Sequence, residues 1–158
     1  MSTDLEHVQS IMKDVRIAML TTTDAEGRLT SRPMTVQESE FDGDAWFFAY
    51  RDSDIAREVE AQPRVNVAYA GSSSWLSLAG TAAVVVDQAK KSELWNDFVE
   101  AWFPDGEHDP NVVLLKVTWE SAQYWDSPGR VASLIDMAKA RVTGTQAGDV
   151  GESGTIDL

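Results

Sequence analysis

The chain has 158 residues, of which 43% are hydrophobic and 25% charged, a composition typical of one soluble globular domain. Its 26 acidic and 13 basic residues give a net charge of −13, which argues against nucleic acid or an anionic membrane as a partner. It contains no cysteine, which excludes disulfides, thiol catalysis and cysteine zinc sites.

The chain shows no sequence signal for a membrane or for export. No stretch approaches the roughly 18 consecutive apolar residues of a membrane span. The first six residues lack the basic-then-apolar order of a signal peptide. We therefore expect a cytoplasmic protein without a membrane partner.

The first third of the chain predicts a helix followed by a β-hairpin. A short amphipathic helix is predicted by apolar residues at helical spacing, namely Leu5, Val8, Ile11 and Met12. Residues 15–22 and 28–37 favour extended chain, and turn-forming residues 24–27 join them. Because Pro33 has no backbone N–H, the second strand is expected at an edge or a bulge, where backbone groups remain for another partner such as a ligand.

The middle of the chain predicts three more strands around one helix. Residues 45–50 are apolar on both faces, so we expect this strand to be central or to have its outer face covered by a partner subunit. Asp52 or Ser53 is suited to cap a helix that ends before Pro63. The next two strands are expected at residues 65–70 and 74–86, with Gly80 marking a bend or bulge.

The remaining residues predict a long helix, a last pair of strands and a tail. The longest helix is expected after Asp87, with one apolar stripe formed by Leu94, Trp95, Phe98, Val99 and Trp102. A loop at 103–110 precedes two strands, or one bent pair, at 112–119 and 121–126, and residues 131–141 have helical composition. The glycine-rich residues 143–158 are expected to form a mobile tail after a single domain at 1–142. These elements predict a mainly β, antiparallel barrel with peripheral helices.

Most catalytic motifs are absent from the sequence. It has no G-x-S-x-G elbow, no G-x-x-x-x-G-K phosphate loop and no G-x-G-x-x-G before a helix. The run 107–109, Glu-His-Asp, is interpreted as a solvated loop rather than a metal site, because three adjacent residues rarely converge on one ion. We therefore expect no metal, and the sequence leaves any catalytic residue unknown.

Four arginines lie within 33 residues of this acidic chain: Arg32, Arg51, Arg57 and Arg64. Each could pair with neighbouring acidic residues on the surface. An arginine fork is also suited to binding phosphate. Arg32 is the strongest candidate for a ligand, because a plain surface arginine has little structural reason to precede a proline inside a strand.

Five runs of the sequence resemble the pyridoxamine 5′-phosphate oxidase-like flavoproteins. These runs are residues 16–22, 27–35, 46–53, 63–69 and 78–82. Further similarity points to the general stress protein 26 branch and is carried by residues 93–95, 101–106, 109–110, 124–128 and 142–144. The resemblance covers nearly the whole chain, and the order and spacing of the runs make it specific.

The resemblance implies a Greek-key-like split β-barrel that forms a homodimer and holds FMN between its two subunits. On this pattern Arg32 binds the flavin phosphate and Ser53 lies at a phosphate-binding position. The isoalloxazine ring is lined by Pro33, Met34 and Thr35. Further cofactor-binding positions implied by the resemblance are Phe48, Ala49, Arg57, Trp75 and Trp125.

Two features depart from the wider family. A lysine common two residues after the serine is Ile55 here, and a threonine is replaced by Ala49. Arg51 or Arg57 is the candidate to replace that lysine. The basic C-terminal segment that the true oxidase uses for its phosphorylated substrate has no clear counterpart, so pyridoxamine phosphate oxidation is not expected.

Three hypotheses for the function follow. The first is an oxidoreductase, related to stress responses by its branch, in which FMN performs the redox chemistry with NAD(P)H or another small-molecule reductant. The second is a binding protein that carries flavin or another heterocycle without turnover. The third is a barrel that has lost the cofactor and serves as an interaction protein. FAD or a deazaflavin in place of FMN also remains open.

Overall fold

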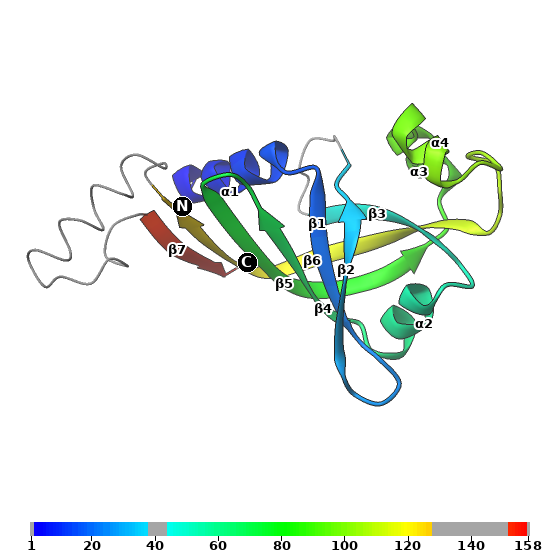
Figure 1. The fold of residues 1–158 in the computed structure, drawn as a ribbon, viewed down its shortest axis with the longest axis horizontal. Coiled ribbons are helices and arrows are strands. Elements are labelled where there is room, and N and C mark those ends of the chain that lie inside the picture. The colour runs from blue at the N-terminus through cyan, green and yellow to red at the C-terminus, as the bar shows by residue number, and fades with distance from the viewer. Residues whose placement is uncertain (1, 38–43, 128–151, 158) are drawn as a thin grey trace, which may run out of the picture.

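The protein is a seven-stranded antiparallel sheet, curled around one core, with helices at its ends and side (Figure 1). The structure is a computed structural model that describes residues 2–37, 44–127 and 152–157. Within these ranges the strands follow the order β2-β1-β4-β5-β6-β3, and β7 also pairs with β6. This is the split barrel expected from the sequence.

The chain begins with helix α1 (Ser2–Asp14) and the hairpin of β1 (Ile17–Thr23) and β2 (Leu29–Thr35). In the turn, Asp24 Oδ1 accepts hydrogen bonds from the backbone N–H groups of Glu26 and Arg28, each at 2.9 Å. Gly27 closes the turn with a φ of 79°, a conformation that favours glycine. β2 ends the strand order, so the expected edge position of the Pro33 strand is confirmed.

The central strands are β4 (Arg64–Ala70), β5 (Ser74–Val85) and β6 (Val112–Asp126). β5 pairs with β6 along the whole length of β5, from Ser74 opposite Asp126 to Val85 opposite Leu114. The other edge of β6 pairs first with β3 (Asp44–Tyr50) and then with β7 (Glu152–Asp157). The two strands expected at 112–119 and 121–126 are therefore one long strand with an irregularity between them.

That irregularity lies at Gly80, as the sequence predicts. The register between β5 and β6 shifts between Ala79 and Gly80, so that Glu120 is left without a partner position on β5. A Cβ atom at Gly80 would lie 2.1 Å from the carbonyl oxygen of Thr118. The close approach of the two backbones explains why glycine is needed here.

The core lies inside the curled sheet and is closed by two helices. Helix α2 (Asp54–Ala61) is capped by Ser53, one of the two expected caps, and buries Ile55, Ala56 and Val59. Helix α1 contributes Val8 and Ile11, which confirms the amphipathic first helix. No helix within the described ranges is long and apolar enough to cross a membrane.

The prediction of one long helix after Asp87 is wrong. The chain forms two short helices instead, α3 (Gln88–Leu94) and α4 (Asp97–Trp102), separated by Trp95 and Asn96 in extended conformation. Asn96 caps α4 by accepting a hydrogen bond from the Val99 N–H at 3.0 Å. Because the helix breaks, the predicted apolar stripe divides, and Phe98 and Trp102 are exposed.

These helices also correct the expectation for β3. Its outer aromatic face is covered by the same chain rather than requiring a partner subunit. Phe48 packs in a second core cluster with Leu94, Val99, Val112 and Leu114. Its ring meets the rings of Trp95 and Phe103 at centroid distances of 5.5 and 6.2 Å.

The predicted tail contains one element that was not expected. Strand β7 pairs with the second half of β6, from Ser121 opposite Asp157 to Asp126 opposite Glu152. Ile156 packs on the main core, and a Cβ at Gly154 would lie 2.7 Å from the Tyr124 ring. The helix expected at 131–141 and the rest of the tail before β7 lie outside the described residues.

Candidate functional site

Arg32 lies on edge strand β2, and its side chain is directed toward α2. The guanidinium donates from Nη1 to Thr22 Oγ1 at 2.8 Å, and from Nη2 to Thr30 Oγ1 at 3.0 Å and to Glu58 Oε2 at 2.9 Å. Thr22 donates to the same carboxylate oxygen at 2.7 Å. The Arg32 side chain is 25% exposed and the Glu58 side chain 16%. The arginine is therefore held in a fixed, half-buried position beside a compensating carboxylate.

The Arg32 guanidinium has N–H donors that its contacts within the chain do not use. A guanidinium has five N–H donors, and the hydrogen bonds above use three of them. An anion that approaches the exposed part of Arg32 would meet Nε and the second hydrogen of Nη1. It would also meet Glu58, whose charge reduces the net attraction.

Ser53 and Arg57 are near the start of α2, but both are used within the chain. Ser53 Oγ accepts from the Ala56 N–H at 3.3 Å and donates to the Tyr50 carbonyl at 2.5 Å. Arg57 donates to the Asp52 carbonyl at 2.6 Å and forms an exposed ion pair with Asp54. Ile55, at the family's lysine position, is buried in the core. The start of α2 therefore offers less free positive charge than the sequence pattern suggests.

The free edge of β2 presents backbone groups. The Val36 N–H donates to the Arg16 carbonyl at 2.8 Å, so alternation along the hairpin directs the backbone of Ser31, Pro33 and Thr35 away from β1. The Gln37 side chain accordingly reaches the Thr35 carbonyl, at 3.2 Å. No described strand pairs with this edge, which is suited to the polar rim of a planar ligand.

The other predicted residues fall into two groups. Phe48 and Ala49 are buried in the two core clusters, so their side chains support the fold of the subunit. Trp75 and Trp125 lie directly opposite each other on β5 and β6. Their side chains are on the outer face of the sheet, 43% and 46% exposed. Met34 packs against the core from the inner side of β2, whereas Pro33 is exposed.

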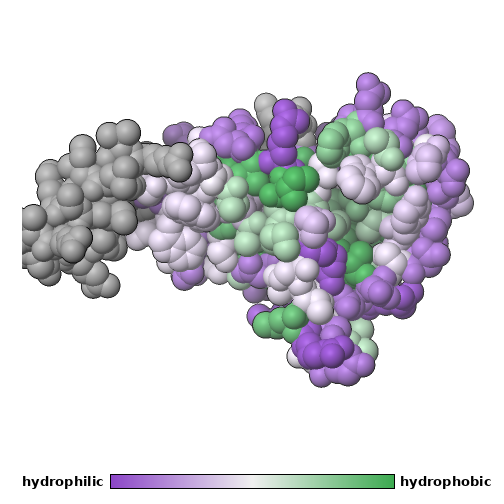
Figure 2. Space-filling model, in the orientation of Figure 1, coloured by the Kyte–Doolittle hydropathy of each residue, from purple (hydrophilic) through white to green (hydrophobic). Residues whose placement is uncertain are grey.

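The outer face that carries the two tryptophans is unusual for so acidic a chain. One row of paired residues crosses five strands without a charge, from Pro33 through Met19, Ala68 and Ser77 to Gln123. A neighbouring row adds Ile17, Ala70, Trp75 and Trp125. We call these nine residues the uncharged face. Figure 2 shows hydrophobic surface over β1 and the strands beside it.

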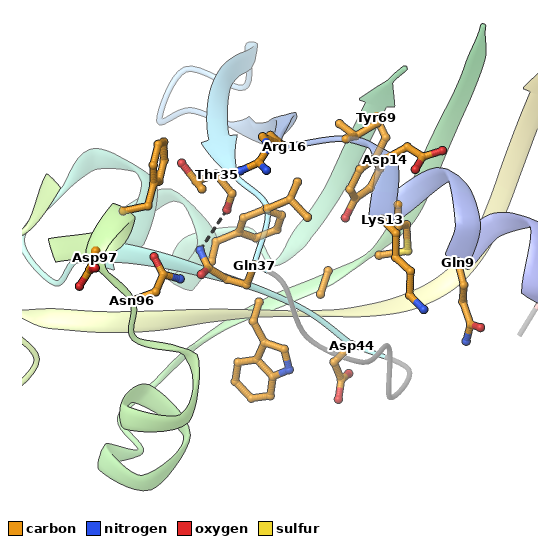
Figure 3. A pocket seen from close by; sticks show the side chains of 17 residues that line it. Gln9, Lys13, Asp14, Arg16, Thr35, Gln37, Asp44, Tyr69, Asn96 and Asp97 are labelled. Carbon is orange, nitrogen blue, oxygen red and sulfur yellow. Dashed lines mark hydrogen bonds between the residues drawn. The ribbon is translucent and has the colours of Figure 1, made fainter. Parts of the chain in front are cut away.

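A cavity of about 920 Å³ lies where α1, the end of β2, the start of β3 and α4 come together (Figure 3). Aromatic walls are provided by Trp46, Phe47, Tyr69 and Phe98. The charged lining residues are Lys13, Asp14, Arg16, Asp44 and Asp97. Of the residues predicted for the site, only Thr35 lines this cavity.

Three side chains around the cavity contain buried polar atoms with no hydrogen-bond partner among the described residues. These atoms are the Tyr69 hydroxyl oxygen, Trp46 Nε1 and Gln37 Oε1. In Figure 3 the Tyr69 ring extends from β4 toward the cavity, with its oxygen at the inner end. Burial raises the pKa of the Tyr69 phenol, so it remains a hydrogen-bond donor at neutral pH.

Sequence reasoning missed Glu58 and the cavity. Thr22, Thr30 and Arg32 lie on the same face of the predicted hairpin, which could have suggested that they form one polar cluster. No pattern in the neighbouring sequence, however, places Glu58 in that cluster. The cavity has no sequence signal, because its lining residues come from five separated elements.

Comparison with known proteins is consistent across sequence and structure. Protein bli-3 of Neurospora crassa is 28% identical over 156 residues, which cover 90% of this chain and 75% of the relative. A crystal structure of a candidate general stress protein 26 from Jannaschia sp. CCS1 matches with a TM-score of 0.78 and 31% identity, covering all of both chains. The general stress FMN/FAD binding protein of Xanthomonas citri matches with a TM-score of 0.67 and 29% identity, covering 79% of this chain and 92% of that one.

The family model described as "Pyridoxamine 5′-phosphate oxidase like" matches residues 3–148. That match spans the hairpin with Arg32, the start of α2, and the paired tryptophans Trp75 and Trp125. The chain belongs to the pyridoxamine 5′-phosphate oxidase-like family.

Proposed function

We propose that this protein binds FMN between the two subunits of a homodimer and uses it as an oxidoreductase. The observation that carries the proposal is Arg32, a half-buried arginine fixed on the free edge of β2. Membership of the family supports it. So does the 29% identity with a protein named for binding FMN and FAD.

In the proposed complex each part of the chain has a distinct role. Arg32 binds the phosphate through its remaining N–H donors, near Ser53 at the start of α2. The edge backbone at Pro33 and Thr35 binds the polar rim of the ring, with Met34 behind it. Trp75 and Trp125 cover the ring and exclude water. Bound flavin supplies hydride or electron transfer, and the chain supplies position and shielding.

The proposed dimer uses the uncharged face. Each subunit carries a net charge of −13, yet this face presents apolar and neutral side chains, among them Met19, Trp75 and Trp125. A second copy of the same chain is the partner that this face suits, because two such faces meet without like-charge repulsion.

We expect Met19→Asp to convert the dimer to single subunits. Met19 lies in the central part of the uncharged face and is 40% exposed, and two aspartates facing each other there would weaken association by about 100-fold or more. Sedimentation of both proteins at matched concentrations measures the change. Val86→Asp is the control, since Val86 is 71% exposed and lies away from this face. A wild-type protein that sediments as one subunit at every concentration would remove the dimer from the proposal.

The flavin part is tested on the protein as purified. We expect a yellow protein whose pigment, released by acid, is identified by chromatography as FMN, with FAD or a deazaflavin as the alternative products. Loss of the yellow colour on anaerobic addition of NADH or NADPH supports an oxidoreductase. A coloured protein that resists NAD(P)H and other reductants is instead a flavin carrier, and a colourless protein that takes up no added flavin contradicts the proposal.

A further inference from the structure

The carboxylate of Glu58 is used through one of its two oxygens. The Oε2 atom accepts from Arg32 Nη2 at 2.9 Å and from Thr22 Oγ1 at 2.7 Å. The Oε1 atom accepts no hydrogen bond from any residue that the structure describes. An ionised carboxylate only accepts, so this oxygen suits a group that brings a hydrogen. Any group that binds the remaining N–H donors of Arg32 lies close to this oxygen and its charge.

The positive charge of Arg32 is matched before any ligand binds. Its guanidinium and the Glu58 carboxylate form an ion pair in which the side chains are 25% and 16% exposed. Strands β1 and β5, which pack against α2, contain no charged residue. Strand β3 contains only Asp44, which contacts Thr118 and Lys116. Arg32 is therefore the one charged side chain among the described residues that contacts Glu58.

The start of α2 adds no unmatched cation on this side of the helix. Arg57 is exposed and forms an ion pair with Asp54. Arg51 lines a groove together with Glu60. Residues 58 and 60 are about 200° apart around a helix, so Arg51 and Glu58 lie on opposite sides of α2. A phosphate bound at Arg32 is therefore not neutralised by a second free cation from α2.

The number of charges on the phosphate then decides how well it is accommodated. The second pKa of a phosphate monoester is about 6, so free FMN carries two negative phosphate charges near pH 8. Two charges beside Glu58 in a half-buried place are poorly compensated, because one arginine serves both anions. A phosphate with one charge repels Glu58 less, and its remaining hydroxyl is a donor for the Oε1 atom.

We infer that Glu58 selects a phosphate group with a single negative charge, and that FMN is bound with one proton on its phosphate. This inference rests on the proposed flavin site and adds which form of the cofactor that site takes. Arg32 supplies the attraction, and Glu58 is the specificity-determining residue. At a pH where free FMN is a dianion, binding must therefore take up one proton from solvent.

The test compares FMN with its methyl phosphate ester, riboflavin 5′-(methyl phosphate). The two share the ring and the ribityl chain, but the ester has one charge throughout the range used. In fluorescence titrations of flavin-free protein between about pH 7 and 8.5, FMN affinity is expected to fall by up to about tenfold per pH unit. The affinity of the ester should stay constant and, near pH 8, exceed that of FMN by about fivefold or more.

Calorimetry measures the proton directly. FMN is titrated into the protein near pH 8 in HEPES and in Tris, two buffers with different heats of ionisation. The difference in binding heat is expected to report uptake of about one proton with FMN and none with the ester. Both comparisons use the wild-type protein, so they do not depend on how a variant folds.

Glu58→Gln keeps an oxygen for Arg32 and Thr22 but removes the charge. We expect this variant to take up no proton with FMN, to lose the pH dependence and to bind FMN at least as tightly as the ester. Glu60→Gln is the matched control, because it makes the same change at an exposed position on the opposite side of the same helix. It is expected to keep the wild-type pH dependence and the preference for the ester.

FMN affinity that is constant across this pH range and no weaker than that of the ester would overturn the inference. Proton uptake that persists in Glu58→Gln would also overturn it, since the proton would then belong to another group. If Glu58→Gln changes the affinity for riboflavin as much as that for FMN, Glu58 acts on a ribityl hydroxyl and not on the phosphate. These three results leave flavin binding in place, whereas a protein that binds neither FMN, the ester nor riboflavin contradicts the proposed function and this inference together.

Discussion

Replacing Arg32 with alanine is expected to weaken FMN binding by about 2–4 kcal/mol, or about 30- to 700-fold in dissociation constant. The physical reason is the loss of charged donors to a phosphate in a half-buried place, where water compensates poorly. The measurement is a fluorescence titration of flavin-free protein with FMN. Riboflavin, which has the same ring and no phosphate, should bind wild type and Arg32→Ala with similar affinity.

Glu58→Gln is the informative partner variant for Arg32. It keeps an oxygen for Arg32 and Thr22 but removes the carboxylate charge that competes with a phosphate. We therefore expect FMN to bind more tightly to Glu58→Gln than to wild type, with riboflavin unaffected. Arg28→Ala is the control, because Arg28 is exposed and paired with Asp24 and Glu26 in the hairpin turn. If Arg32→Ala weakens FMN and riboflavin equally, Arg32 acts on the fold and not on the phosphate.

Replacing Gly80 with alanine is expected to lower the free energy of unfolding by about 3 kcal/mol or more. The added Cβ would lie 2.1 Å from the Thr118 carbonyl oxygen and 3.1 Å from the Trp119 Cα, both backbone atoms of the neighbouring strand. Backbone atoms cannot turn aside as a flexible side chain can, so the contact between β5 and β6 must open. Urea unfolding followed by circular dichroism measures the change.

Gly106→Ala is the matched control for Gly80→Ala. Gly106 has a φ of 88° but nothing within 4 Å of its Cβ position, so only the conformational cost of about 1 kcal/mol is expected. Equal destabilisation by the two substitutions would show that the close approach at Gly80 does not limit stability.

Much of the fold could be predicted because its signals are local. The hairpin depends on turn chemistry at Asp24 and Gly27, and the edge position of β2 follows from the missing N–H of Pro33. Ser53 caps helix α2 by accepting a hydrogen bond from the N–H of Ala56, only three residues along the chain. A glycine inside a strand pattern signals a bulge or a close approach of two backbones. At Gly80 the structure shows the reason, because a Cβ atom would collide with the Thr118 carbonyl oxygen.

The errors have a common origin in contacts between distant parts of the chain. The apolar stripe after Asp87 has helical spacing, but Asn96 starts a new helix and the two short helices pack over Phe48. Strand β7 has almost no apolar content and was not predicted. It forms because β6 extends beyond β3 and leaves an edge to pair with.

The amino-acid order by itself determined the strand-rich class and the placing of Arg32 on an edge, because these depend on composition, turns and proline geometry. It also carried the runs of residues that resemble the family. Only the tertiary structure decided that Arg32 forms an ion pair with Glu58, which lies 26 residues away in the sequence. It also decided that Tyr69, Trp46 and Gln37 are all among the residues that line one cavity. Sheet curvature and helix packing bring such residues together, and neither is encoded within a short stretch of sequence.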